Sequence, residues 1–259
     1  MRKTYYLPDG AIYAPYLLDL IDGNHVLIAG TVGAGKSVLE NAILYSLLCA
    51  RFPGADDTGR NARFVLIDPK RVELKPYEKL PHVIRYADNL PDIKDTLQYV
   101  REIIEYRFDV MQRQGQRKTS QAPIYVFIDE LVDLVTNKQY GKDIVRILAD
   151  SASISRAAGV FFVVLTQSPS RVIIPAQFKL LFNCRVALRC NNSIESRQII
   201  DDDSATELPR HGIGIVQQNL DRYRIKIPYY SDEEIYNIID FWKKQDTFGF
   251  RLRRLFDRE

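Results

Sequence analysis

A glycine-rich segment that ends in a lysine and a serine carries the clearest chemistry in this chain. Residues 26–37 read Val-Leu-Ile-Ala-Gly-Thr-Val-Gly-Ala-Gly-Lys-Ser, an apolar run followed by the Walker A pattern G-x-x-x-x-G-K-S. Backbone N–H groups of such a loop point at phosphate oxygens, the lysine reaches the β- and γ-phosphates, and the serine hydroxyl ligates Mg²⁺. The pattern therefore predicts a site for ATP and Mg²⁺. The expected nucleotide contacts are Gly30, Thr31, Val32, Gly33, Ala34, Gly35, Lys36, Ser37 and Val38.

The second chemical signal is an acidic pair, Asp129-Glu130, which ends the apolar run Ile124-Tyr-Val-Phe-Ile like a Walker B motif. A carboxylate at the carboxyl end of a parallel strand lies at the mouth of the sheet, beside the P-loop. We expect Asp129 to hold the Mg²⁺ shell together with Ser37, and Glu130 to orient and polarise the attacking water. The pair favours a hydrolase over a small-molecule kinase, for which the sequence suggests no acceptor pocket or lid.

Two further candidates flank one apolar run, Val160–Leu165. The run ends in Thr166-Gln167, and the Gln167 amide at the strand tip can sense the γ-phosphate or the catalytic water. Arg156 comes just before the same run. In a ring of subunits, its guanidinium would stabilise charge developing on the γ-phosphoryl group of a neighbour's nucleotide.

A fold must bring these residues together, and the hydrophobic pattern predicts which fold it is. Apolar runs alternate with helical patterns, which indicates an α/β fold with a mostly parallel central sheet and helices on both faces. The expected strands are 26–29, 64–68, 124–129, 160–166 and 185–189. Apolar residues at i, i+3 and i+4 predict helices over 37–51, 92–113 and 143–157. A hairpin over 213–217 and 222–228 and an amphipathic helix over 232–244 are expected after them.

Composition and organisation bound the class of protein. The 259 residues carry a formal net charge of +3, which does not by itself indicate nucleic-acid binding. No linker or repeat divides the chain, so we expect one domain over 1–244, with surface loops at 53–61 and 113–123 and a basic tail at 245–259. Cys49, Cys184 and Cys190 form no CxxC pair, which fits a reducing cytoplasm. No signal peptide or bilayer-spanning segment is evident, so we expect a cytoplasmic protein without membrane insertion.

In their order along the chain, these segments resemble the motor core of the FtsK/SpoIIIE family of DNA translocases. The matching stretches start with His25–Ser37 and with Phe64–Leu74, which contains Ile-Asp-Pro-Lys. They continue through 77–82, 127–134, 156–159, 165–170 and 195–201, the last reading Glu-Ser-Arg-Gln-Ile-Ile-Asp. The resemblance implies a RecA-like P-loop NTPase fold and a hexameric ring. It also implies DNA-stimulated ATP hydrolysis that moves DNA, most simply duplex DNA, through a central channel.

The resemblance also assigns positions. Gln167 matches the family's sensor position, Arg156 is the best candidate for an arginine finger that acts in trans, and Arg197 is a second candidate for a subunit contact. Asp68 and Lys70 of the Ile-Asp-Pro-Lys segment receive no role. Ser168 stands where the family commonly has arginine, and Arg171 follows three residues later. We expect the loop 168–179 to contact DNA, with Arg171 and Lys179 as its cations.

Other readings stay open from sequence alone. The family's N-terminal membrane region and C-terminal winged helix find no room here, so we expect a motor from a plasmid, conjugative element or phage, working with transfer or replication proteins. One rival keeps the chemistry and delivers single-stranded DNA or a nucleoprotein to a transfer channel. Another is an ATP-binding scaffold with little turnover, against which Glu130 argues because a scaffold needs no water-polarising carboxylate.

Overall fold

A single sheet organises the part of the chain that the computed structural model describes, which is residues 17, 21–50, 62–174, 176–219 and 221–245. Its strand order is β3-β2-β4-β5-β1-β6-β7-β8. The strands are β1 (Val26–Ala29), β2 (Arg63–Ile67), β3 (Val83–Ala87), β4 (Ile124–Ile128), β5 (Val160–Thr166), β6 (Cys184–Ala187), β7 (Ile213–Gln218) and β8 (Asp221–Lys226). Strands β1 to β6 pair in parallel, and the β7–β8 hairpin is antiparallel.

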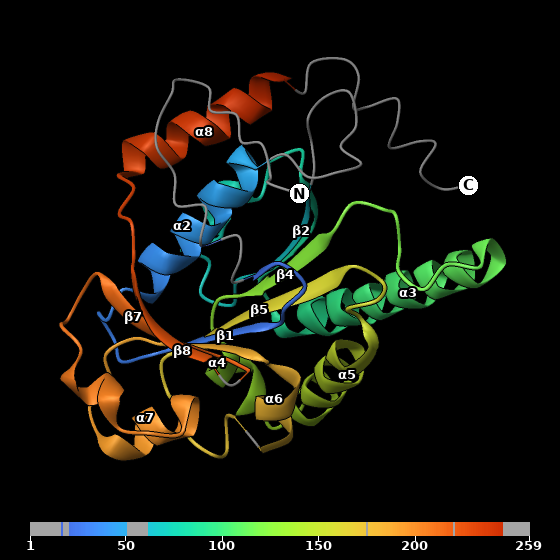
Figure 1. Cartoon of the computed structure of the whole chain (residues 1–259). Helices are drawn as coiled ribbons and strands as arrows, with labels where there is room; N and C mark the ends of the chain where they lie inside the picture. The colour runs from blue at the N-terminus through green and yellow to red at the C-terminus, as the bar shows by residue number, and fades with distance from the viewer. Residues whose placement is uncertain (1–16, 18–20, 51–61, 175, 220, 246–259) are drawn as a thin grey trace.

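Helices cover both faces of this sheet (Figure 1). The helices are α2 (Lys36–Cys49), α3 (Leu90–Gln114), α4 (Leu131–Val135), α5 (Gly141–Ile154), α6 (Ala176–Leu181), α7 (Ser193–Ile200) and α8 (Asp232–Gln245), with 3₁₀ turns η1 (Lys75–Tyr77) and η2 (Ser204–Glu207). Helices α2 and α8 lie over one face, and α3 and α5 lie over the other. The predicted α/β fold with a mostly parallel sheet and helices on both faces is confirmed.

The central strands are apolar throughout because both of their faces are buried. In β5, Phe161, Val163 and Leu165 join the core under α2 and α8. Their neighbours Val160, Phe162 and Val164 join the core under α3 and α5. Successive side chains of a strand point to opposite faces, so one short strand supports two hydrophobic layers. The carboxyl ends of β1, β4 and β5 are thereby held side by side.

Several expectations from the sequence are wrong in detail. Strand β3 and the short helices α4, α6 and α7 were not expected. The expected strand 185–189 is β6, which covers Cys184–Ala187, and Leu188 and Arg189 follow it as hydrogen-bond partners of Ala29 and Thr31. Lys179, expected in a loop, lies in helix α6. The expected loop 53–61 and residues 246–259 of the expected tail lie outside the described residues.

Candidate nucleotide-hydrolysis site

The glycine-rich loop joins the end of β1 to the start of α2, and its conformation explains its glycines. Gly35 has φ of 93°, a left-handed conformation that side-chain-bearing residues rarely adopt. Gly30 is required by close packing, because a Cβ there would lie 2.7 Å from the Leu188 Cβ. The backbone N–H of Thr31 donates to the Arg189 carbonyl at 2.9 Å and fixes the loop against the chain after β6. Helix α2 begins directly at Lys36, so its positive N-terminal end faces the loop.

A cavity of about 470 Å³ lies over this loop. Five of the predicted site residues line it together, namely Lys36, Ser37, Asp129, Glu130 and Gln167. They come from the start of α2, the end of β4 and the end of β5, three elements that are far apart in sequence. The predicted contacts Val32, Gly33, Gly35 and Val38 also line the cavity, whereas Gly30, Thr31 and the buried Ala34 do not. The arrangement expected from parallel strand ends is therefore present.

Lys36 has internal partners at the floor of this cavity. Its Nζ atom donates to the carbonyl oxygens of Gly30 at 2.9 Å and Thr31 at 3.0 Å. Burial lowers the pKa of Lys36, while the negative charge of Glu130 opposes that shift and the positive charge of Lys70 adds to it. An ammonium group held on neutral carbonyls can exchange them for phosphate oxygens, which attract it more strongly.

Asp129 lies in a concentration of negative charge. Burial raises its pKa to about 7, and the nearby carboxylates of Asp68 and Glu73 contribute to the same shift. A divalent cation would relieve this repulsion, and the Ser37 hydroxyl is a second oxygen donor in the same cavity. Among the described residues no group of three or more His, Cys, Asp or Glu side chains could hold a metal alone. This donor set fits Mg²⁺, which commonly takes one or two protein oxygens and completes its shell with phosphate and water.

Glu130 is almost fully buried, with 1% of its surface exposed, and three donors hold it. Its Oε1 atom accepts from the backbone N–H groups of Val132 at 3.2 Å and Gln167 at 3.3 Å. Its Oε2 atom accepts from Lys70 Nζ at 3.2 Å. The bond to Val132 makes Glu130 the N-cap of α4. A carboxylate held this way has a defined direction, which a general base requires.

The cavity also contains residues that sequence reasoning missed. Lys70, Val72 and Glu73 from the segment after β2 line it, as does His211 before β7. The signal for Lys70, Val72 and Glu73 was the Ile-Asp-Pro-Lys stretch, which stood out in sequence but suggested no chemistry. Glu40 is a further omission, since it is fully buried in α2 and its nearby charges include Asp129. A single acid within an otherwise apolar helix face was the signal for Glu40.

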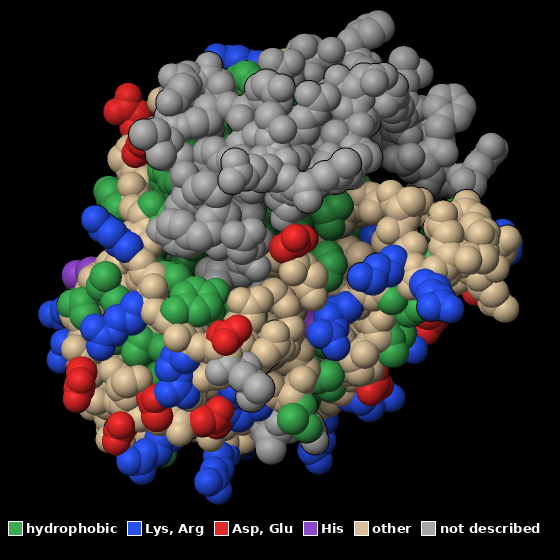
Figure 2. Space-filling view, in the orientation of Figure 1, with side chains coloured by type: hydrophobic (Ala, Val, Ile, Leu, Met, Phe, Trp, Pro, Cys, Tyr) green, Lys and Arg blue, Asp and Glu red, His purple; other side chains and the backbone are tan. Residues whose placement is uncertain are grey.

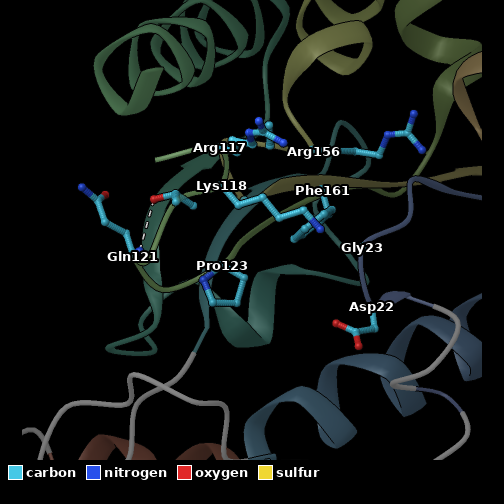
Figure 3. A pocket seen from close by; sticks show the side chains of 11 residues that line it. Asp22, Gly23, Arg117, Lys118, Gln121, Pro123, Arg156 and Phe161 are labelled. Atoms are coloured by element: carbon cyan, nitrogen blue, oxygen red, sulfur yellow. Dashed lines mark hydrogen bonds between the residues drawn. The ribbon is translucent and has the colours of Figure 1, made fainter. Parts of the chain in front are cut away.

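Arg156 comes just before β5, at the amino-terminal end of the parallel strands, whereas the P-loop lies at their carboxyl end (Figure 3). Strands β1 and β5 run parallel, with Ala29 opposite Thr166, so the P-loop and Arg156 are separated by the length of β5. At about 3.3 Å per residue this length is roughly 20 Å. Arg156 shares a second cavity, of about 530 Å³, with Arg117, Lys118 and Asp22. Arg156 therefore cannot reach a nucleotide on the P-loop of its own subunit.

The loop that carries Arg117 and Lys118 is anchored beneath this second cavity. Buried Arg107 donates from Nη1 to the Ala158 carbonyl and from Nη2 to the Ala122 carbonyl, both at 2.8 Å. These bonds tie the loop after α3 to the turn that precedes β5. In Figure 3 the Lys118 side chain extends toward Phe161, while the Arg156 side chain points away from the sheet. Among the described residues, no ion pair joins Arg117, Lys118 or Arg156 to a carboxylate.

The candidate DNA-contacting and interface cations are spread over other elements. Arg171 is exposed in the turn after β5. Lys179 is only 18% exposed and pairs with Asp201 at 2.8 Å. Arg197 pairs with Asp203 at 2.9 Å. On the part of the face in Figure 2 that shows described residues, the Lys and Arg side chains are interspersed with Asp and Glu.

Comparison with known proteins places this geometry in context. Residues 1–122 match the model of the FtsK/SpoIIIE family. A DNA translocase FtsK from Chlorobaculum tepidum is 33% identical over 252 residues, which cover 88% of this chain and 30% of the relative. One from Helicobacter pylori is 32% identical over 259 residues, covering 89% of this chain and 28% of the relative. The chain thus spans about a third of the length of the curated relatives that it matches.

Solved structures agree on the fold. The pCW3 conjugation coupling protein TcpA, solved with ATPγS, superposes with a TM-score of 0.72 at 22% identity, covering 85% of this chain and 65% of that chain. The cytoplasmic domain of the type VII secretion ATPase EccC from Thermomonospora curvata gives a TM-score of 0.67 at 19% identity, covering 83% of this chain and 27% of that one. The fold is that of the RecA-like P-loop ATPases. Within the described residues, every helix is too short or too polar to cross a bilayer.

Proposed function

The chain belongs to the FtsK/SpoIIIE family, and from that premise we propose that it is a Mg²⁺-dependent ATPase motor that moves double-stranded DNA. Membership implies nucleotide binding. The observation that carries the proposal is the grouping of Lys36, Ser37, Asp129, Glu130 and Gln167 around one cavity. DNA as the moved substrate comes from the curated relatives, which are named DNA translocases.

We assign the nucleotide contacts to the P-loop, residues 30–35, with Lys36, Ser37 and Val38. In this assignment, backbone N–H groups of the loop and the α2 N-terminus bind the phosphates, and Lys36 exchanges its carbonyl partners for phosphate oxygens. Ser37 and Asp129 hold the Mg²⁺, which when bound offsets negative charge on the phosphates. The raised pKa of Asp129 supports this assignment, because it reflects burial together with crowded negative charge at that point.

The hydrolytic step is assigned to Glu130 and Gln167. Glu130 accepts a proton from the attacking water and orients that water toward the γ-phosphorus. The Gln167 side chain lines the same cavity, where its amide can contact the γ-phosphate or the water. Because the Gln167 N–H also donates to Glu130, the sensor and the base are held in one arrangement.

We assign Arg156 to act on the nucleotide of a neighbouring subunit. Its position at the end of the strands opposite to the P-loop supports this action in trans, and Arg117 and Lys118 line the same cavity as Arg156. A contact between the P-loop surface of one subunit and the Arg156 surface of the next subunit is head-to-tail. When the rotation that relates neighbouring subunits closes on itself, such contacts form a ring. We propose a hexameric ring. Arg197 is a weaker candidate for this interface because it already pairs with Asp203.

DNA is proposed to contact the turn after β5, with Arg171 as its exposed cation. Lys179 would have to leave Asp201 to reach a phosphate. Contacts of this kind neutralise phosphates without reading bases, so binding is expected to weaken with salt and to depend little on sequence. Cys49, Cys184 and Cys190 are buried and form no disulfide, which supports a reducing cytoplasm as the location of the protein.

The same cavity would also serve a coupling ATPase that delivers single-stranded DNA, or a scaffold that binds ATP without turnover. Steady-state ATP hydrolysis without DNA, with single-stranded DNA and with duplex DNA separates the three, with Lys36→Ala as the blank. Greatest stimulation by duplex supports the proposed motor, and greatest stimulation by single strands favours the coupling ATPase. No hydrolysis in any condition would contradict the ATPase assignment.

A further inference from the structure

The segment after β2 forms a turn that its own aspartate organises. Asp68 is fully buried at the end of β2. Its Oδ1 atom accepts from the Arg71 N–H at 2.8 Å, and its Oδ2 atom accepts from the Leu74 N–H at 3.1 Å. One carboxylate thus holds the middle and the end of the turn 68–74. The turn also includes Pro69, whose ring restricts the backbone just before Lys70.

This turn presents Lys70 to the buried carboxylate at the end of β4. Lys70 Nζ lies 3.2 Å from Glu130 Oε2, and the Lys70 side chain is 39% exposed while Glu130 is 1% exposed. The other two donors to Glu130, the N–H groups of Val132 and Gln167, both bind Oε1. Lys70 is therefore the one donor to Oε2 among the described residues. Two hydrogen bonds to Oε1 alone leave the Glu130 carboxylate free to rotate about that oxygen, whereas a third bond to Oε2 fixes the plane of the carboxylate.

We propose that Lys70 is a positioning residue for Glu130. In this proposal the turn 68–74, which is held by the Asp68 carboxylate, keeps the Lys70 ammonium on Glu130 Oε2. The inference rests on the proposed role of Glu130 as the base in ATP hydrolysis. With its plane fixed, Glu130 directs a lone pair toward the water that attacks the γ-phosphorus. A small misorientation of a catalytic group lowers a rate by about a hundredfold. Lys70 thus contributes to turnover through Glu130.

The competing role for Lys70 is direct contact with the nucleotide. Lys70 lines the same cavity as Lys36, so its ammonium is within the space open to phosphates. The two roles predict different results when Lys70 is replaced in a protein that already carries Glu130→Gln. A residue that acts through Glu130 has no effect once Glu130 has lost its function as a base. A phosphate-binding residue keeps its effect and also changes nucleotide affinity.

A double-mutant cycle tests this. Lys70→Met keeps the aliphatic stem and removes the ammonium, Lys70→Arg restores a cation, and Glu130→Gln removes the base. The measurements are kcat and KM for ATP, the dissociation constant of a fluorescent ATP analogue, and the thermal midpoint. Lys94→Met is the matched control, because Lys94 forms a 2.7 Å ion pair with Asp143 and is 37% exposed outside the nucleotide cavity.

We expect Lys70→Met to lower kcat by about a hundredfold with KM and analogue affinity nearly unchanged. Lys70→Arg should recover part of kcat, and Lys70→Met should have no further effect in the Glu130→Gln background. Lys94→Met should keep wild-type kcat. An unchanged kcat for Lys70→Met, or an effect that persists with Glu130→Gln, would overturn the inference. If the wild type does not hydrolyse ATP, the proposed function fails and the inference fails with it.

Discussion

The backbone N–H of Gln167 donates a hydrogen bond to Glu130 Oε1, and the two atoms lie 3.3 Å apart. This bond joins the ends of β4 and β5, which are neighbours in the sheet. It involves the backbone of Gln167, so the side-chain amide remains available to the cavity. The proposed sensor and the proposed base are therefore connected by a contact that most substitutions of Gln167 would leave intact.

Glu130→Gln is expected to reduce kcat for ATP by about 10²- to 10⁴-fold, the usual contribution of a general base. The amide oxygen can still accept from the Val132 and Gln167 N–H groups, so the fold and nucleotide affinity should be kept. Steady-state hydrolysis and analogue binding measure the two effects. Asp133→Asn is a control on the same helix, because Asp133 does not line the nucleotide cavity. Unchanged hydrolysis in Glu130→Gln would show that Glu130 is not the base.

Arg156→Ala is expected to lower hydrolysis by several orders of magnitude if its guanidinium acts on a neighbour's nucleotide. The decisive form of the test mixes subunits. Lys36→Ala and Arg156→Ala should each be inactive alone, and a mixture should regain activity, since some interfaces then join an intact P-loop to an intact Arg156. Arg146→Ala, an exposed arginine on α5, is the control. No recovery in mixtures, with assembly verified by light scattering, would argue against action in trans.

Sequence predicted the central strands, and it predicted that Lys36, Ser37, Asp129, Glu130 and Gln167 lie together, because both expectations depend on local patterns. Strands buried on two faces must be apolar, and a phosphate loop needs glycines at fixed spacing. Strand β3 was missed because it is an edge strand, paired only with β2, and it contains partly exposed Arg85 and Tyr86. Helix α7 was missed although its capping signal is present: Asn192 accepts from the Glu195 N–H at 2.9 Å.

The bond between Lys70 and Glu130 could not be predicted from sequence, since these residues are 60 positions apart and meet only because β2 and β4 are neighbours in the sheet. Sequence likewise gave no sign that Lys179, expected to contact DNA, is paired with Asp201. Its ion pair with Asp201 depends on how α6 packs beside α7. Contacts that arise from tertiary packing carry no local pattern, so they become visible only in the structure.

Glu40→Leu is expected to stabilise the protein by about 1–3 kcal/mol at pH 8. Glu40 is fully buried, and its Oε1 atom has no hydrogen-bond partner among the described residues. Burial first, and then the charges of Asp129, Glu73 and Asp68, raise the pKa of Glu40 well above its ordinary value. The folded protein then keeps a proton that the unfolded chain loses, so Glu40 reduces stability as pH rises above about 4.5.

Urea unfolding of the wild type and Glu40→Leu between pH 5 and pH 8 measures this effect. The advantage of the variant should grow with pH. Glu102→Leu, at an exposed position on α3, is the matched control and should show no such trend. A variant that is less stable than the wild type at every pH would mean that Glu40 has a stabilising partner.

His25 should make the fold sensitive to acid. Its Nε2 atom pairs with the Ala152 carbonyl at 2.9 Å, and its Nδ1 atom accepts from the Phe162 N–H at 3.0 Å. Burial lowers the pKa of His25 to about 4, the bond to Ala152 opposes this shift, and the charge of Arg156 adds to it. Between pH 6.5 and pH 4 the unfolded chain takes a proton that the folded protein does not, so stability falls by about 3 kcal/mol as pH falls through this window.

The free energy of unfolding of His25→Leu should lack this contribution. The variant is expected to be less stable than the wild type at pH 7, because the Phe162 N–H loses its acceptor. The difference in the free energy of unfolding between the wild type and His25→Leu should become smaller as pH falls from 6.5 to 4. His211→Leu serves as control, since His211 is exposed and should leave the slope unchanged. A gap that widens toward low pH would contradict the lowered pKa of His25 in the folded protein.

The central claim is that ATP hydrolysis moves this protein along duplex DNA. Displacement of a fluorescent triplex-forming oligonucleotide from a long duplex tests it most directly, since a motor travelling on the duplex strips the third strand. We predict displacement by the wild type with ATP and Mg²⁺, and none with Lys36→Ala or with a non-hydrolysable ATP analogue. ATP hydrolysis that duplex DNA stimulates, without displacement of the third strand, would contradict translocation.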